Sequence, residues 1–472
     1  MNTPTPLVVS KRSVGIPPLP LHDIQGLILC DYGLPAVRHF FVRVEHPEAG
    51  RRLVRTLIRN SPPDLHIMTA AEWTAQVGWS SALNVGFTYT GLQALHLPEA
   101  TLASFAGAKA FVAGAVERAT LIGDCGKSAP HRWRGNLNSR EVHVMFSVYA
   151  EKEKLAVLGA SFRELIRQHE CTVLHHEDGA VLEDGPPQRE KLPGVLIHFG
   201  YRDGISQPVI AGAPNPQYAT VNPTLVAPGA FLLGHPSQWE GFQYPVPHPL
   251  DFGRNGSFAA FRILQQDVEG FEAYLSTAAA VTKLDREKIA AKICGRWLNG
   301  VALTAKTPST LPSIPPDHQL NDFAFTDDAQ GLVCPFDAHI RRTNPRGDSV
   351  AGADGDRHPI VRRGMPYGPK YDPVTRDQHE RGLLGVFVCA SIEDQFEFLM
   401  TSWINRGGFR PELTSASKDL ITGNNTLGET GFQLPTASGM VTLPPFADFV
   451  TTRGAAYCFL PSITGLTYIA DL

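Results

Sequence analysis

The sequence predicts an α+β fold with mixed or antiparallel sheets. Helix-like and strand-like segments alternate with short loops in both halves of the chain. The segment EVHVMFSVYA, residues 141–150, places an apolar residue at every second position, which predicts a half-buried strand. A sheet with one open face is typical of antiparallel or mixed pairing. Because the order of elements is similar in the two halves, we expect a duplicated fold.

The first half contains helices with one apolar face and strands rich in β-branched and aromatic residues. Apolar residues recur at helical spacing over 47–60 and over 153–170, so both segments are predicted to be helices. The strands are predicted over residues 38–47, 82–91, 141–150, 171–182 and 194–200.

The second half repeats this alternation after an unusual middle region. Residues 205–260 are rich in glycine, proline and aromatic residues and are too apolar for a disordered linker, so we expect a long ordered excursion near a site. A strand over 256–267 precedes a helix over 268–281, and a strand over 382–390 precedes a helix over 391–408.

Length and composition exclude several classes of function. A chain of 472 residues is too long for one ordinary core. The formal net charge of -4 gives no sign of a nucleic-acid or membrane-surface partner, and no apolar run is long enough to span a bilayer. The seven cysteines are scattered without a C-x-x-C pair, which predicts reduced thiols in a cytoplasmic protein. A small-molecule partner is therefore expected.

Three short stretches hold candidate functional residues. In FGYRDGISQP, residues 199–208, glycines flank Asp203 and would expose its carboxylate on a turn, although a lone Asp-Gly is usually only a turn. In CPFDAHIRRTNPR, residues 334–346, His339 could be a metal ligand, a catalytic base, a phosphate contact or a packed core residue. In HPIVRRGMPYGP, residues 358–369, an arginine could stabilise a developing negative charge.

The combination favours one chemistry over the alternatives. A carboxylate, one histidine ligand and a guanidinium are the groups that a haem peroxidase needs. Iron bound by one axial histidine leaves its opposite face open to hydrogen peroxide, where a base and a cation can promote uneven O–O cleavage.

In this order, the three stretches resemble those of the dye-decolorising peroxidases. GYRDGISQP fits the family's G-x-x-D-G motif, CPFDAHIRRTNPR its proximal-histidine segment and RRGMPYG its distal-arginine segment. The resemblance extends over nearly the whole chain. The length of the chain and its inserted middle region are similar to those of the longer subgroups of the family. It implies two ferredoxin-like domains with mixed or antiparallel sheets and peripheral helices, of the dimeric α+β barrel type. We expect a flexible tail over 1–20, an N-terminal domain over 21–208 with the Asp203 loop, and a haem-binding domain over 209–472.

The resemblance also implies roles for individual residues. His339 would be the proximal ligand of haem b, Asp203 the distal acid and base, and Arg362, rather than Arg363, the distal cation. The resemblance also implies that Arg342 and Arg346 contact a haem propionate. Glu393, in preference to Glu397, would accept the second N–H of His339. Gly385 is a departure, because the family often carries a bulkier residue on the strand over the haem.

The implied activity is reduction of hydrogen peroxide with oxidation of dyes, phenols or other aromatic donors, by a monomer or homodimer. Large donors could instead be oxidised through a surface relay, for which Trp297, Tyr367 and Trp403 are candidates by residue type. Two alternatives stay open. The chain could bind or handle haem with little peroxidase turnover, or it could be a non-haem binding module in which all three motifs are structural turns.

Overall fold

The computed structural model describes most of the chain. The described residues are 18–75, 79–182, 195–214, 225–238, 241–305, 320–321, 323–347, 349–350, 353–354, 358–407, 418–425, 432–436 and 439–472. The predicted tail over 1–20 lies outside them except for its last three residues. Within this part of the chain, no helix combines the length and apolar character needed to cross a membrane.

The first half forms a ferredoxin-like unit. Its strands pair in the order β2-β3-β1-β4, all antiparallel. One helix follows β1 and another follows β3, which gives the βαββαβ order of this fold. The elements are β1 (Ala36–Val44), α2 (Pro47–Arg59), β2 (Ser81–Phe87), β3 (Val144–Ala150), α8 (Lys152–Gln168) and β4 (Cys171–Ala180).

The second half repeats the same pattern. Its strands pair in the order β12-β13-β9-β16, again antiparallel, with helices after β9 and after β13. The elements are β9 (Ser257–Gln266), α10 (Val268–Thr282), α11 (Arg286–Cys294), α13 (His339–Thr343), β12 (Val361–Tyr367), β13 (Gly382–Cys389), η8 (Ile392–Glu397), η9 (Leu399–Ile404) and β16 (Val450–Leu460). The predicted α+β class and the duplication are therefore confirmed, while the boundary at residue 208 stays a prediction.

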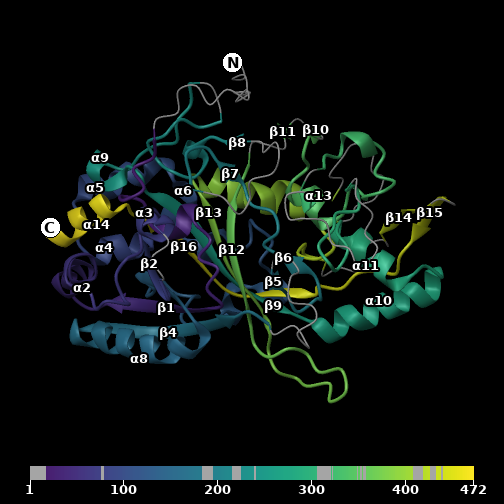
Figure 1. Ribbon diagram of the computed structural model, residues 1–472, viewed down its shortest axis with the longest axis horizontal. Helices are drawn as coiled ribbons and strands as arrows, with labels where there is room; N and C mark the ends of the chain where they lie inside the picture. Colours follow the sequence, from purple (N-terminus) through teal and green to yellow (C-terminus); the bar gives the residue numbers. More distant parts are fainter. Residues whose placement is uncertain are drawn as a thin grey trace.

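The two units join into one eight-stranded sheet. β16 pairs with β2 through Phe459 and Phe87. At the other end, a Cβ built on Gly179 of β4 would lie 2.8 Å from Met365 Cγ of β12, so the two edge strands approach each other closely. The sheet thus curls into the predicted α+β barrel, with the first half on the left and most of the second on the right in Figure 1.

Shorter elements decorate this barrel. Several lie between β2 and β3, and α14 at the C-terminus lies beside α2 of the first half (Figure 1). They are α1 (Gly26–Leu29), α3 (Ala70–Thr74), α4 (Tyr89–Ala94), α5 (Glu99–Ala103), η1 (Ser104–Gly107), α6 (Lys109–Ala113), α7 (Ala115–Arg118), η2 (Gly126–Ser128), η3 (Pro130–Arg132), β5 (Val195–Leu196), β6 (Arg202–Asp203), β7 (Val209–Ile210), β8 (Leu225–Val226), η5 (Pro228–Ala230), α9 (Leu250–Gly253), η6 (Thr326–Asp328), β10 (Ser349–Val350), β11 (Ala353–Asp354), β14 (Gln433–Thr436), β15 (Gly439–Thr442) and α14 (Ile463–Asp471).

The main core lies where the two halves face each other. The ring of Phe261 on β9 packs against Phe41 and His39 of β1, with centroids 5.2 and 5.0 Å apart. Burying a ring of this size contributes roughly 1.5–3 kcal/mol. One sequence expectation is wrong here: β3 is buried on both faces, because α8 covers the second face and places Phe162 against Phe146.

Candidate functional site

Asp203 lies on a tight turn made by two glycines. Gly200 and Gly204 have φ of +84° and +77°, in the left-handed region that glycine enters without strain. The Gly204 N–H donates to Asp203 Oδ1 at 2.7 Å. Gly200 lies between the paired strands β5 and β6, and Asp203, the last residue of β6, has its carboxylate beside the edge strand β12.

Arg362 on β12 forms an ion pair with Asp203. Its Nη1 donates to Asp203 Oδ1 at 3.0 Å and its Nη2 donates to the Ser206 carbonyl at 2.7 Å. Both charged side chains are 33% exposed, so the pair is accessible. Burial alone would raise the pKa of Asp203, but the Arg362 guanidinium and the Gly204 N–H hold it below its ordinary value.

Gln207 fastens the same loop to the backbone of β12. Its Nε2 donates to the Arg362 carbonyl at 2.8 Å, and its Oε1 accepts the Arg362 N–H at 3.0 Å. Among the described strands, β12 pairs only with β13, so these backbone groups face away from its one strand partner. The amide of Gln207 therefore takes the place of a neighbouring strand and sets the position of Arg362 relative to Asp203.

Arg363 points to the opposite face of the sheet. Successive side chains of a strand alternate between faces, and Arg363 Nε donates to the Leu27 carbonyl at 3.0 Å. The structure thus brings Arg362, and not Arg363, to Asp203.

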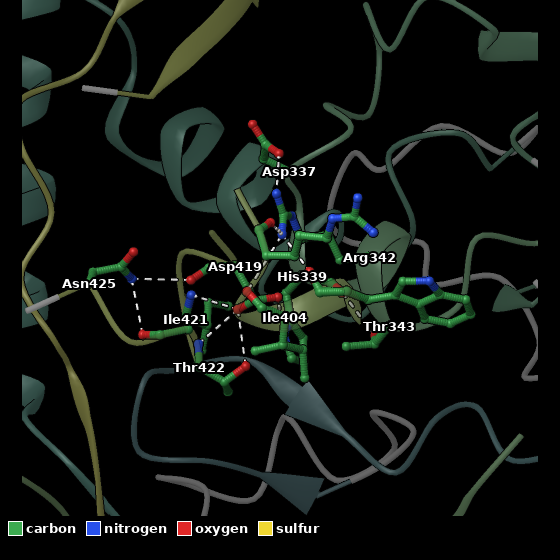
Figure 2. Close-up of polar contacts among 12 residues, drawn as sticks. Asp337, His339, Arg342, Thr343, Ile404, Asp419, Ile421, Thr422 and Asn425 are labelled. Carbon is green, nitrogen blue, oxygen red and sulfur yellow. Dashed lines mark hydrogen bonds and ion pairs between the residues drawn. The ribbon is translucent and has the colours of Figure 1, made fainter. Parts of the chain in front are cut away.

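His339 begins the short helix α13, and a buried carboxylate holds its ring. His339 Nδ1 donates to Asp419 Oδ2 at 2.9 Å. Figure 2 shows the other oxygen of Asp419 receiving the N–H groups of Ile421 and Thr422, at 2.9 and 2.7 Å. Asp419 is completely buried, and its pKa is lowered to about 2: burial alone would raise it, but His339 and these N–H groups outweigh that effect.

The second nitrogen of His339 suits a metal. Nε2 has no hydrogen-bond partner among the described residues, and the side chain is 25% exposed. Although burial disfavours the charged ring, the Asp419 carboxylate raises the pKa of His339. A carboxylate at Nδ1–H fixes the tautomer and strengthens Nε2 as a ligand. Haem iron can be held through one proximal histidine, so these residues fit a haem.

The predicted partner of His339 is wrong. Neither glutamate is at the imidazole, because both are engaged on another side of their helix. Glu393 accepts the backbone N–H of Ala110. Glu397 forms a bidentate ion pair with Arg118 and accepts a hydrogen bond from Tyr457.

The predicted propionate contact of Arg342 is also wrong. The Arg342 side chain is completely buried, and its guanidinium donates to Asp337 Oδ1 at 2.7 Å (Figure 2). It also donates to the carbonyls of Trp403 and Arg406. A buried guanidinium needs such partners, so Arg342 ties α13 to the end of η9.

Arg346 lies between the histidine segment and the aspartate loop. Its Nη2 donates to Ser206 Oγ and its Nη1 to the Asn321 carbonyl, both at 2.8 Å. The guanidinium also lies 4.1 Å from the ring centroid of Phe323. Arg346 therefore remains at the candidate site, and its contact with a propionate stays a prediction.

The candidate residues share one electrostatic environment. The Asp203 charge raises the pKa of His339 and the Arg362 charge lowers it. Arg346, from the same segment as His339, donates to Ser206 Oγ on the Asp203 loop, while Arg362 contacts Asp203 directly. The structure thus brings the His339 segment to the Asp203–Arg362 pair, although these residues are far apart in sequence.

The face of β13 beside Arg362 is shaped by Gly385 and Phe387. Phe387 is the cross-strand neighbour of Arg362. A Cβ built on Gly385 would lie 2.7 Å from Phe387 Cε2, so the Phe387 ring already fills the space beside the glycine.

Two of the candidate relay residues do not lie at the surface. Tyr367 and Trp403 are buried, whereas Trp297 is partly buried. A surface relay is therefore not supported for Tyr367 or Trp403.

Sequence reasoning missed Asp419 and Gln207. Asp419 lies 80 residues after His339 and Gln207 lies 155 residues before Arg362. The only local signals are the Asp-x-x-Thr spacing at 419–422, typical of a side-chain-capped turn, and the closeness of Gln207 to Asp203.

Comparisons with known proteins find peroxidases that are similar to this chain over most of its length. No family model matches the chain. A curated relative, "Peroxidase 2" from Mycetinis scorodonius, is 29% identical over 495 residues, covering 97% of this chain and 88% of the relative. A dye-decolorizing peroxidase from Exidia glandulosa is 27% identical and covers 98% and 89%. A multifunctional dye peroxidase from an Amycolatopsis strain is 29% identical and covers 87% and 86%.

Solved structures match over almost the same length. A dye-decolorizing peroxidase in complex with 2,6-dimethoxyphenol has a TM-score of 0.79 at 26% identity, covering 96% of this chain and 100% of that one. A variant of the dye-decolorizing peroxidase from Pleurotus ostreatus has a TM-score of 0.80 at 27% identity, with the same coverage.

Proposed function

We propose that this chain, which is similar over nearly its whole length to dye-decolorising peroxidases, is itself such an enzyme and uses haem b to reduce hydrogen peroxide while oxidising dyes, phenols or other aromatic donors. It is therefore an oxidoreductase that acts on a peroxide. The observation that carries the proposal is the Asp203–Arg362 ion pair, whose loop Arg346 joins to the segment of His339, the histidine that Asp419 holds at Nδ1.

Each residue of the site has a proposed role. His339 Nε2 would hold the iron, and Asp419 would keep the ring in the required orientation and tautomer. Arg346 would meet a propionate, because it is the arginine that lies between the two motif segments. Haem supplies the electron-transfer chemistry once it is bound.

The proton chemistry of the peroxide would belong to Asp203 and Arg362. The ionised Asp203 carboxylate accepts the proton of one peroxide oxygen and returns it to the other, which then leaves as water. Arg362 stabilises the negative charge that develops as the O–O bond breaks. Gln207 and Ser206 hold Arg362 in position for this step.

The proposal also covers the location and the assembly of the protein. The seven cysteines are all free and only Cys125 is exposed, which supports the cytoplasm as the location. We retain a monomer or homodimer as the proposed assembly.

An absorption spectrum tests the proposal directly. The full chain, produced with adequate haem, should show a Soret band that changes on addition of hydrogen peroxide and returns when a dye is added. His339→Ala should weaken haem binding and change the band, while Arg59→Met, at an exposed ion pair far from the site, should behave like the wild type.

Different results would point to the alternatives. Absence of a Soret band despite a haem supply would favour a non-haem binding module. A normal band that peroxide does not alter would favour haem handling without turnover, and would contradict the proposed peroxidase reaction.

A further inference from the structure

Tyr457 occupies the same face of the sheet as Arg362. In register, Arg362 pairs with Phe387, Phe387 with Ala260, and Ala260 with Tyr457. Residues directly opposite each other in antiparallel strands point to the same side. Neighbouring strands lie about 4.8 Å apart, so the backbone of Tyr457 is about 14 Å from that of Arg362.

Aromatic rings connect the two positions. Phe396 of η8 lies over this face of the sheet, with its centroid 5.4 Å from Phe387 and 6.1 Å from Tyr457. Phenylalanine has no acidic proton, so Tyr457 is the first side chain along this row that can lose an electron and a proton together.

The Tyr457 hydroxyl has a built-in proton acceptor. It donates to Glu397 Oε1 at 3.1 Å. Arg118 holds this carboxylate through both oxygens, with Nε 3.0 Å from Oε1 and 3.2 Å from Oε2. Tyr457 is only 2% exposed, but the Arg118 side chain is 29% exposed. The three groups therefore connect a buried phenol to the surface.

The surroundings keep the phenol protonated at rest. Burial and the nearby Glu397 charge both raise the pKa of Tyr457 well above its ordinary value. Removing only an electron would leave a positive charge in the interior, which is costly. Oxidation of Tyr457 therefore requires that the proton leave with the electron, and Glu397 is in hydrogen-bond contact to receive it.

We propose that Tyr457 is an internal electron donor of this enzyme and that Glu397 is its proton acceptor; the proposal rests on the proposed peroxidase function. With haem bound and oxidised by peroxide, the phenol would give one electron to the oxidised haem. Its O–H bond breaks, the proton passes to Glu397 Oε1, and a neutral tyrosyl radical remains. An aromatic donor at the surface near Arg118 then supplies one electron, and Glu397 returns the proton to Tyr457.

Electron paramagnetic resonance tests this assignment on the haem-loaded full chain. One equivalent of hydrogen peroxide is added without a dye, and the sample is frozen within milliseconds. We expect a tyrosyl signal that narrows when the protein contains ring-deuterated tyrosine. The signal should fall to background in Tyr457→Phe, which removes only the hydroxyl.

A second buried tyrosine provides the matched control. Tyr274 is also buried, but its hydroxyl donates to the Pro444 carbonyl, which cannot take a proton. Tyr274→Phe should therefore keep the full signal. Glu397→Gln, which leaves an oxygen facing the phenol but no carboxylate, should lose it while the Soret band remains.

The outcomes separate this inference from the proposed function. If peroxide is consumed but the tyrosyl signal is absent, or persists at full intensity in Tyr457→Phe, the assignment of Tyr457 is overturned and the peroxidase function stands. If the wild type does not consume peroxide at all, the proposed function fails and this inference fails with it.

Discussion

Asp203 remains ionised in acid because Arg362 is its ion-pair partner. The ordinary pKa of an aspartate is about 3.9, and that of Asp203 is held lower. A depressed pKa in the folded state also means that this interaction stabilises the fold above the ordinary pKa and is lost as the pH falls through the folded-state value. The form that can accept a proton is therefore present over most of the acidic range.

We expect dye oxidation to have an acidic optimum whose activity falls only near or below the ordinary pKa of an aspartate. In Asp203→Asn the rate should fall about 10²–10⁴-fold, because a positioned general acid and base contributes this much. Initial rates measured from acid to neutral pH check both points.

Another aspartate that forms an ion pair with an arginine serves as the control. Asp178 pairs with Arg38 on an exposed part of β4, so Asp178→Asn should leave the pH profile unchanged. An optimum above neutrality that Asp203→Asn does not alter would contradict the role of Asp203.

At the scale of elements, the site depends on a loop attached to an edge strand. The Asp203 loop is irregular, whereas β12 is held by β13 along its other edge. Gln207 connects the two by pairing with both backbone groups of Arg362. Because each hydrogen bond contributes about 1 kcal/mol, this connection is strong enough to restrict where the loop places its carboxylate.

Gln207→Leu should therefore slow the reaction with peroxide clearly, while the free energy of unfolding changes little. Losing both hydrogen bonds corresponds to about 2 kcal/mol, or roughly a 10- to 50-fold lower rate of peroxide reduction. Stopped-flow measurement of that rate, beside a thermal unfolding curve, separates the two effects.

The conservative variant sharpens this test. Gln207→Glu keeps an acceptor for the Arg362 N–H but loses the donor to its carbonyl, so it should lie between the wild type and Gln207→Leu. Equal rates in all three proteins would show that the loop is positioned without Gln207.

The elements of the barrel were predictable because each carries its own pattern. Alternation and helical spacing located β1, α2, β3, α8 and α10 to within a few residues. The hydrogen-bond partners of the site residues could not be predicted in this way, because they depend on which segments the fold brings together. Asp419 contacts His339 although it lies 80 residues away in the sequence, while Glu397, which is nearer in the sequence, contacts Arg118. Arg342 was misplaced for the same reason, because its burial is set by α13 and η9 together.

At the scale of the whole molecule, buried charges also connect the two halves. Arg262 of β9 in the second half pairs with Asp124 of the first half at 2.6 Å, and both side chains are 4% exposed. Thr452 Oγ1 donates to the same Asp124 oxygen at 2.7 Å. The ion pair joins the β9–β16 region to the loop that follows α7.

Removing one member of this pair should destabilise the fold strongly. Arg262→Met leaves Asp124 buried without its counter-charge, which costs about 3–5 kcal/mol in the free energy of unfolding. The double variant Arg262→Met with Asp124→Asn should recover part of this loss, since no unpaired charge remains. Denaturant unfolding of the full chain measures all three free energies.

An exposed ion pair gives the matching baseline. Arg59 and Asp471 are 44% and 50% exposed, so Arg59→Met should cost less than about 1 kcal/mol. If Arg262→Met were no more destabilising than Arg59→Met, the Arg262–Asp124 pair would not contribute to holding the halves together. The pairing of β16 with β2 and the approach of β4 to β12 would then have to account for that junction.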